Sequence, residues 1–206
     1  MDGTVLDLAF DNHFWLVVVP DAYGAKRGLS GQQARCELEA RYDRVAGQLS
    51  WYCLDYWSDE LELDIRGLKR AHRHLIGYLP GALAFLRQAR ALGKRLVIVT
   101  NAHPAALEVK LSQTRLDAFV STIISSHRCG FAKENPRFWS SLAGHLEYAP
   151  ASSLLIEDSA AVVSTAAAHG LRTLMVRRPD SRQARRELDT SAAIDGLGDL
   201  VATMSL

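Results

Sequence analysis

From Pro80 to Arg177 the sequence alternates between short β-branched runs and stretches with apolar residues at helical spacing. This alternation is typical of a parallel β-sheet whose strands are joined by crossover helices. It predicts strands at 95–100, 119–126, 153–158 and 172–177, and helices at 81–93, 136–146 and 159–169, with another helix beginning at Pro104. Open sheets of this kind place their ligands at the carboxyl ends of the strands. We therefore expect an α/β fold with its functional residues along one edge of the sheet.

Residues 11–78 show a different pattern, with long amphipathic stretches and no strand-like alternation. We expect helices over 31–47, 51–63 and 68–78, with a turn at 61–64. A length of 206 residues suits one domain that carries a sizeable insertion. We therefore assign residues 1–10 and 79–206 to an α/β core domain, and residues 11–78 to a helical cap domain inserted into it.

The charge balance narrows the class of partner. Lys and Arg total 24 against 23 Asp and Glu, which argues against electrostatic binding to nucleic acid or to an anionic membrane. No apolar run approaches the roughly 18 residues that span a bilayer. Cys36, Cys53 and Cys129 lack metal-type spacing, so we expect reduced thiols in a cytoplasmic protein. The near-neutral charge balance is still compatible with a small anionic substrate, because binding such a substrate needs positive charge only within the pocket.

Two adjacent carboxylates, Glu157 and Asp158, end the predicted strand 153–158. Hard oxygen ligands suit Mg²⁺, which binds through one or two carboxylates together with substrate phosphate. We expect Asp158 to be a metal ligand, and Glu157 to be either a second ligand or an acceptor for metal-bound water. The alternative is that Asp158 only caps the helix that follows it.

Thr100 ends another predicted strand directly before a helix. Its hydroxyl and the backbone N–H groups of Asn101 and Ala102 can hold a phosphate oxygen at the positive end of the helix dipole. Ordinary helix capping is the alternative. Lys133 lies in a predicted loop, where it can neutralise a phosphate, although a loop lysine is usually exposed and inert. Together these residues predict a phosphate site.

Taken in chain order, four groups of residues resemble the four motifs of phosphatases of the haloacid dehalogenase (HAD) superfamily: Asp2-Gly3-Thr4, Thr100-Asn101, Lys133 and Glu157-Asp158-Ser159. The stretches 6–15, 51–57 and 100–104 are similar to the bacterial GMP/IMP nucleotidase branch. The resemblance implies a HAD-like Rossmannoid parallel sheet with an inserted helical cap of the C1 type. It also implies a Mg²⁺-dependent 5′-nucleotidase that hydrolyses purine nucleoside monophosphates through an aspartyl-phosphate.

The resemblance also implies a role for each residue. Asp2 is the general acid and base and offers its backbone carbonyl to the metal, Thr100 holds the transferring phosphoryl group, and Lys133 offsets its charge. His103 follows Thr100 closely enough to contact substrate. Purine recognition falls to the cap, whose candidate stacking residues, each with core packing as the alternative, are Phe14, Trp15, Tyr52 and Trp57.

In HAD phosphatases the first motif begins one Asp earlier, and Met1 stands between its two aspartates. We expect the recorded start to fall directly after this attacking carboxylate, with the first, central strand of the sheet largely missing. Losing about five buried apolar side chains at roughly 1.5–3 kcal/mol each would cost on the order of 10 kcal/mol. The 206-residue chain is therefore expected to be inactive for lack of its nucleophile.

Two other functions stay open. A sugar-phosphate phosphatase or a phosphomutase of the same fold would share these motifs, and the choice depends on whether water or a sugar hydroxyl reaches the phosphoenzyme. A non-catalytic nucleotide-binding or interaction protein would use the core only as a scaffold. The hypothesis of a non-catalytic scaffold is less favoured, because the chain keeps polar residues at the ends of separate segments: Asp2, Thr100, Lys133 and Asp158.

Overall fold

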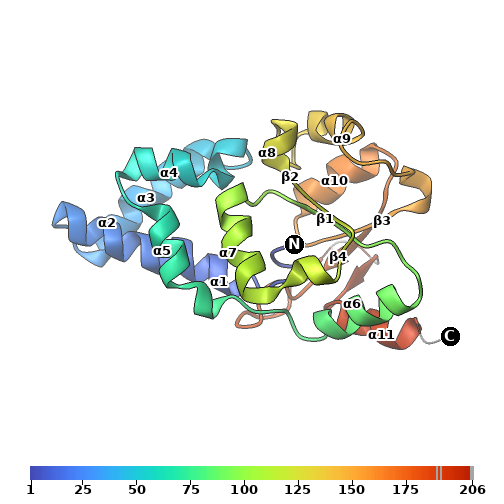
Figure 1. The fold of residues 1–206 in the computed structure, drawn as a ribbon. Coiled ribbons are helices and arrows are strands. Elements are labelled where there is room, and N and C mark those ends of the chain that lie inside the picture. The colour runs from blue at the N-terminus through green and yellow to red at the C-terminus, as the bar shows by residue number, and fades with distance from the viewer. Residues whose placement is uncertain (189, 191, 205–206) are drawn as a thin grey trace.

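The computed structural model describes residues 1–188, 190 and 192–204. Figure 1 shows parallel strands with covering helices on one side of the molecule and a group of helices on the other. The strands are β1 (Val97–Thr100), β2 (Thr122–Ser125), β3 (Leu154–Glu157), β4 (Arg172–Val176) and β5 (Ala193–Ile194). All of their pairings are parallel. The predicted α/β fold and its predicted strands are confirmed with shorter bounds, whereas the sequence pattern missed β5.

Among the described residues the strands form two sheets, β1-β2 and β3-β4-β5. A cavity of about 700 Å³ reaches both β1 and β3 and is lined by residues of these strands, by Met1 and Val5, and by residues of the covering helices and of the segment before β3. The N-terminal segment reaches this cavity as a turn, in which the Met1 carbonyl accepts hydrogen bonds from the N–H groups of Val5 (2.8 Å) and Leu6 (3.0 Å). The cavity is therefore bordered by the segment that carries Asp2.

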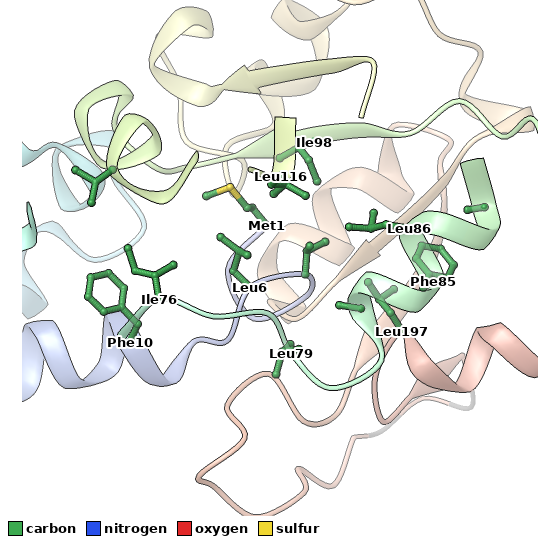
Figure 2. Close-up of a cluster of buried hydrophobic side chains, with 14 residues drawn as sticks. Met1, Leu6, Phe10, Ile76, Leu79, Phe85, Leu86, Ile98, Leu116 and Leu197 are labelled. Carbon is green, nitrogen blue, oxygen red and sulfur yellow. The ribbon is translucent and has the colours of Figure 1, made fainter. Parts of the chain in front are cut away.

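Helices cover both sheets and enclose two apolar clusters. They are α6 (Ala82–Ala91), α7 (Pro104–Thr114), α8 (Ser126–Cys129), α9 (Pro136–Leu142), α10 (Ala160–Ala168) and α11 (Gly198–Thr203). Figure 2 shows that Met1 and Leu6 pack in one cluster with residues of β1 and α6, including Ile98 and Leu86. A second cluster surrounds Trp139. The N-terminal segment is thus part of the core.

Most predicted core helices agree with the structure to within two residues at each end. The helix predicted at 136–146 is the exception, because α9 ends at Leu142. Gly144 follows two residues later and is a poor helix former, and its N–H bonds the Ser141 carbonyl at 3.0 Å. The chain therefore leaves the helix before Leu146.

The inserted segment is helical, as expected. The helices α1 (Ala9–His13) and α2 (Val19–Arg27) are joined by a π-helical turn (Phe14–Val18) into one continuous stretch, and α3 (Gly31–Val45), α4 (Leu54–Leu61) and α5 (Ile65–Ala71) follow. Short 3₁₀ turns occupy Leu49–Tyr52 and Arg73–Leu75. These helices pack around an apolar cluster of their own, which includes Phe14, Tyr23, Leu38, Trp57, Leu61 and Ile65.

The turn predicted at 61–64 is present. Glu62 has a φ of 52°, in the left-handed region, and ends α4. The helix predicted at 68–78 instead begins at Ile65, because the Asp64 side chain accepts a hydrogen bond from the Gly67 N–H at 2.7 Å and caps the helix three residues earlier. The α-helical part ends at Ala71 and gives way to the 3₁₀ turn.

A buried group of charges links these helices to the core. Asp11 of α1 accepts hydrogen bonds from Lys69 of α5 at 2.9 Å and from Lys110 of α7 at 2.6 Å. Each lysine is only 2% exposed. Burial opposes ionisation of Asp11, but the two ammonium groups outweigh it and hold the pKa of Asp11 well below its ordinary value. Asp11 therefore serves as the shared counter-charge of two buried lysines.

Replacing Asp11 with Asn should lower the free energy of unfolding by about 3–5 kcal/mol, because two buried ammonium groups lose their common carboxylate. Urea unfolding at neutral pH, followed by circular dichroism, measures the change. The exposed residue Asp43 provides a matched control, and Asp43→Asn should leave the unfolding free energy nearly unchanged.

We also expect the Asp11→Asn substitution to change how the free energy of unfolding depends on pH. Because folding depresses the pKa of Asp11, its contribution to stability is present above the ordinary carboxyl pKa of about 3.9 and is lost as the pH falls through the lower folded value. Unfolding curves collected from neutral to acid pH should therefore be flatter for Asp11→Asn than for the parent. Parallel curves for the two proteins would contradict this assignment.

Candidate active site

A cavity of about 340 Å³ lies where the carboxyl ends of the strands meet the helical insertion. β1 ends at Thr100 and β3 ends at Glu157, and parallel strands bring such ends to the same edge of a fold. Most of the predicted site residues line this one cavity: Asp2, Trp15, Tyr52, Thr100, Asn101, Ala102, His103, Lys133, Glu157 and Asp158.

Lys133 and Glu157 form a buried ion pair in the wall of the cavity. The Lys133 ammonium donates to Glu157 Oε2 at 2.5 Å, and each residue is 4% exposed. Burial opposes the charge of both groups, but their attraction raises the pKa of Lys133 and lowers that of Glu157. The alternative of an exposed, inert loop lysine is therefore wrong, because Lys133 is buried and charged beside the cavity.

Both oxygens of Glu157 are engaged within the protein. Oε2 accepts from Lys133, while Oε1 accepts from the backbone N–H groups of Asp158 at 3.1 Å and Ser159 at 3.3 Å. These bonds fix the loop that follows β3. A Glu157 carboxylate used in this way is better placed to support its neighbours than to bind a ligand directly.

Asp158 lies against the backbone of the N-terminal segment. A Cβ atom added to Gly3 would come within 2.4 Å of Asp158 Oδ2, and Gly3 has a φ of 72°, so this position requires glycine for both reasons. Burial and the Glu157 carboxylate raise the pKa of Asp158 to about 7. The capping alternative is wrong, because Ser159 is the residue that caps α10, through a bond from the Val162 N–H.

No lysine, arginine or histidine of the described residues lies within ion-pair distance of the Asp158 carboxylate. Arg186 lies nearby, but it donates to the Asp158 backbone carbonyl at 3.0 Å and forms no ion pair with the carboxylate. A carboxylate whose pKa is raised by burial and by a neighbouring carboxylate is one that a bound cation would stabilise in its charged form. Asp158 and the adjacent backbone of Asp2 and Gly3 are oxygen donors of the kind that hard divalent ions prefer. These residues are therefore the candidate metal ligands.

Thr100 does not cap the helix that follows it. Its Oγ1 accepts from the Ala102 N–H at 3.1 Å, whereas the cap of α7 is His103, whose Nδ1 accepts from the Ala105 N–H at 3.2 Å. The ordinary-capping alternative for Thr100 is wrong for this reason. Because α7 begins only at Pro104, the Ala102 N–H is in a loop before the helix instead of in its first turn.

Asn101 connects two loops of the site. Its Oδ1 accepts from the Lys133 N–H at 2.9 Å, and its Nδ2 donates to Glu134 Oε2 at 2.8 Å. Tyr52 of the insertion donates to the other Glu134 oxygen at 2.5 Å. The side chain of Asn101 thus positions Lys133, and Glu134 joins this arrangement to the insertion.

The sequence pattern missed Lys69, Lys110 and Asp11, which also line the cavity. Lys110 Nζ lies 2.6 Å from Asp2 Oδ1, so Asp2 also has a buried ammonium group as its partner. The sequence did contain a signal that Lys69 and Lys110 are buried. Lys110 falls four residues after Ala106 and Lys69 four after Ile65, on helix faces that are otherwise apolar, where a lysine needs a buried partner.

The aromatic residues of the insertion divide between the cavity and a packed interior. Trp15 and Tyr52 line the cavity, as do Trp51 and Tyr42, which the sequence analysis did not single out. Phe14 and Trp57 are 0% exposed within the cluster of the insertion. The stacking role considered for Phe14 and Trp57 is therefore corrected to core packing, because neither ring reaches the cavity.

Similarity to known proteins agrees with this geometry. A family profile for haloacid dehalogenase-like hydrolases matches residues 1–170. The protein named GMP/IMP nucleotidase YrfG, from Escherichia coli K12, is 38% identical over 205 residues, which cover 99% of this chain and 92% of that protein.

Solved structures show the same fold. A HAD phosphatase from Thermococcus onnurineus superposes with a TM-score of 0.80 at 21% identity, covering 99% of this chain and 94% of that one. The HAD-hydrolase YfnB from Bacillus subtilis, described as bound to magnesium, gives a TM-score of 0.66 at 17% identity and covers 100% and 96%. Within the part of the chain that the structure describes, no helix is long and apolar enough to cross a membrane. This chain is an enzyme that belongs to the haloacid dehalogenase-like hydrolase family.

Proposed function

We propose that this protein is a Mg²⁺-dependent phosphomonoester hydrolase, and that its substrates are purine nucleoside 5′-monophosphates such as GMP and IMP. The observation that carries the proposal is that Asp2, Thr100, Lys133 and Asp158 line a single cavity although they come from four separate parts of the chain. The name of the E. coli relative, GMP/IMP nucleotidase, supports the choice of substrate. The cavity is the active site of the core, and residues 11–78 are the cap that closes over it.

Each side chain has a role that its surroundings support. Thr100 and the adjacent loop hold the phosphoryl oxygens, and Lys133 offsets their charge. Asp2 protonates the leaving ribose oxygen and then takes a proton from the attacking water. Each transfer changes the charge of Asp2 beside Lys110, and Asp11 keeps that ammonium paired in both states.

The aspartyl-phosphate part of the proposal needs an attacking carboxylate in the position directly before Met1, as the resemblance to HAD phosphatases implies. That nucleophile would lie beside the Asp2–Gly3 turn, which packs against Asp158. Burial lowers the pKa of the Met1 amino group, and the charge of Lys133 lowers it further, so Lys133 lies close to this position. Lys133 would therefore offset part of the charge of a carboxylate attached there.

Asp158 and the Asp2 backbone carbonyl would hold Mg²⁺, with Glu157 supporting them through its bonds to the loop. A bound Mg²⁺ would supply charge compensation for the substrate phosphate. The Asp158 carboxylate, whose pKa is raised by burial and by Glu157, supports this placement, because a bound cation would stabilise its charged form.

Recognition of the base would fall to the aromatic wall of the cavity formed by Trp15, Trp51 and Tyr52. Aromatic rings bind a purine by stacking, whereas a sugar phosphate offers them no flat surface. This wall favours a nucleotidase over a sugar-phosphate phosphatase or a phosphomutase. The three unpaired cysteines support a cytoplasmic protein.

A phosphate-release screen tests the proposal. The 206-residue chain should be compared with a version extended by an apolar segment ending in Asp directly before Met1, and with the same extension ending in Asn. With Mg²⁺, the Asp-ended protein should release phosphate fastest from GMP and IMP, and the other two should be inactive. Activity on sugar phosphates alone would overturn the nucleotidase assignment. Nucleotide binding without any phosphate release would indicate a binding protein.

Within the Asp-ended protein, Asp2→Asn should lower kcat by a factor of about 10²–10⁴, because it removes the general acid and base while keeping the size of the side chain. Steady-state kinetics with GMP measures the loss. Asp117, which is exposed, offers a control whose replacement by Asn should leave kcat unchanged. An Asp2→Asn variant with full activity would remove Asp2 from the mechanism.

The aromatic wall can be tested separately from the chemistry. Trp51→Leu should weaken GMP binding by about 1–3 kcal/mol, the value of one base stacked on an aromatic ring. The KM for GMP should rise accordingly, while the KM for ribose 5-phosphate, which carries no base, should stay the same. Equal changes for both substrates would place the base elsewhere.

A further inference from the structure

Three side chains able to bind a metal ion meet where the insertion joins the core. One ligating atom of each of Cys53, His103 and His127 lies within 4.8 Å of the other two. Cys53 directly precedes α4 of the insertion, while His103 and His127 belong to the core, before α7 and in α8. Figure 1 shows α8 and the start of α7 on the side of the core that faces the insertion.

The two imidazoles are in a state that suits coordination. Their rings meet edge to face with centroids 4.9 Å apart. Burial lowers the pKa of both His103 and His127, which keeps the rings neutral, and neutral imidazole is the form that binds metals. His127 Nε2 is buried and finds no hydrogen-bond partner in the described part of the chain. The backbones of Tyr52 and Asn101 lie near this ring, and a metal ion would be a stronger partner for Nε2 than these neutral groups.

The sulfur of Cys53 lies at the positive end of a helix dipole. Its Sγ accepts the Tyr56 N–H at 3.5 Å as the cap of α4. The thiolate is the form of cysteine that binds metals. The sulfur thus keeps lone pairs available beside the two imidazoles.

An oxygen ligand is also within reach. Asp55 Oδ2 lies 3.6 Å from His103 Nε2, and Arg66 binds the other oxygen, Oδ1. Coordination through His103 Nε2 would move the ring proton to Nδ1, and the bond that this nitrogen accepts from Ala105 would be given up. Asp55 is near His103 but is not among the residues whose ligand atoms all lie within 4.8 Å of one another, so a movement of Asp55 toward Cys53 and His127 would give the cluster one sulfur, two nitrogens and one oxygen.

We propose that Cys53, His103 and His127, with Asp55 as the fourth ligand, form a site for one transition-metal ion of the Zn²⁺ class. Thiolate and imidazole ligands favour Zn²⁺ over the hard ion Mg²⁺, so this site differs in chemistry from the carboxylates around Asp158. Binding releases the thiol proton to solvent.

Binding of a metal ion at this site would affect how the insertion is held against the core. Cys53 and Asp55 come from the insertion and both histidines come from the core, so a bound ion would cross-link the two parts. His103 also lines the active-site cavity. Zinc–ligand distances of about 2.0–2.3 Å would draw the ligand atoms closer together than they now lie. A bound ion therefore holds the insertion against the core beside the cavity.

Titration of the full chain with Co²⁺, a spectroscopic stand-in for Zn²⁺, tests the site without any activity measurement. Binding should produce thiolate-to-cobalt charge-transfer absorption and the intense visible bands of tetrahedral Co²⁺, saturating at one ion per chain. Zn²⁺ should remove these bands, whereas excess Mg²⁺ should not. A spectrum of octahedral Co²⁺ without a thiolate band would overturn the proposal.

Two pairs of variants locate the ion. Cys53→Ser, which keeps a capping oxygen at the start of α4, should abolish the thiolate band, whereas Cys36→Ser, at an exposed thiol on α3, should not. His127→Gln should weaken Co²⁺ binding by at least about 10–100-fold, the effect that loss of a supporting residue alone produces. His74→Gln, at an exposed histidine, should have no effect. A thiolate band that survives in Cys53→Ser would refute the site, whatever the outcome of the phosphate-release screen.

Discussion

The packing of the insertion against the core, and of the loop before α9 against β3, depends on ion pairs made by three buried lysines. Lys69, Lys110 and Lys133 are 2%, 2% and 4% exposed. A buried charge is tolerated only when it is paired, so each lysine requires a carboxylate at its position. Asp11 holds Lys69 and Lys110 together, and Glu157 holds Lys133. These pairs connect the insertion to α7, and the loop before α9 to the end of β3.

The same pairs determine the electrostatics of the cavity. The chain carries nearly equal numbers of acidic and basic residues, so its overall charge would not attract an anion. Lys69, Lys110 and Lys133 line the cavity, but each is paired with a carboxylate, and five carboxylates line the same cavity: Asp2, Asp11, Glu134, Glu157 and Asp158. An anionic substrate would therefore need the bound cation proposed at Asp158 in addition to the lysines.

Residues at strand ends could be placed from the sequence, whereas residues inside helices could not. Thr100, Glu157 and Asp158 follow apolar runs, and parallel strands end at a common edge, so their meeting was predictable. Trp15 and Trp57 looked equivalent in the sequence, but one lines the cavity and the other is buried in the insertion. That division depends on how the helices of the insertion pack against one another and against the core, which a local pattern does not encode.

The sequence by itself determined the alternation of strands and helices in the core, the helical character of the insertion and the order of the polar groups at the strand ends, because these depend on local periodicity and chain direction. Only the tertiary structure decided that Lys110 pairs with Asp2 and Asp11, and that Cys53, His103 and His127 converge. Lys110 and Asp11 are 99 positions apart. Contacts over such separations depend on how the insertion packs against the core. A buried charged group needs an opposite charge beside it, and only the folded chain determines which residue supplies that charge.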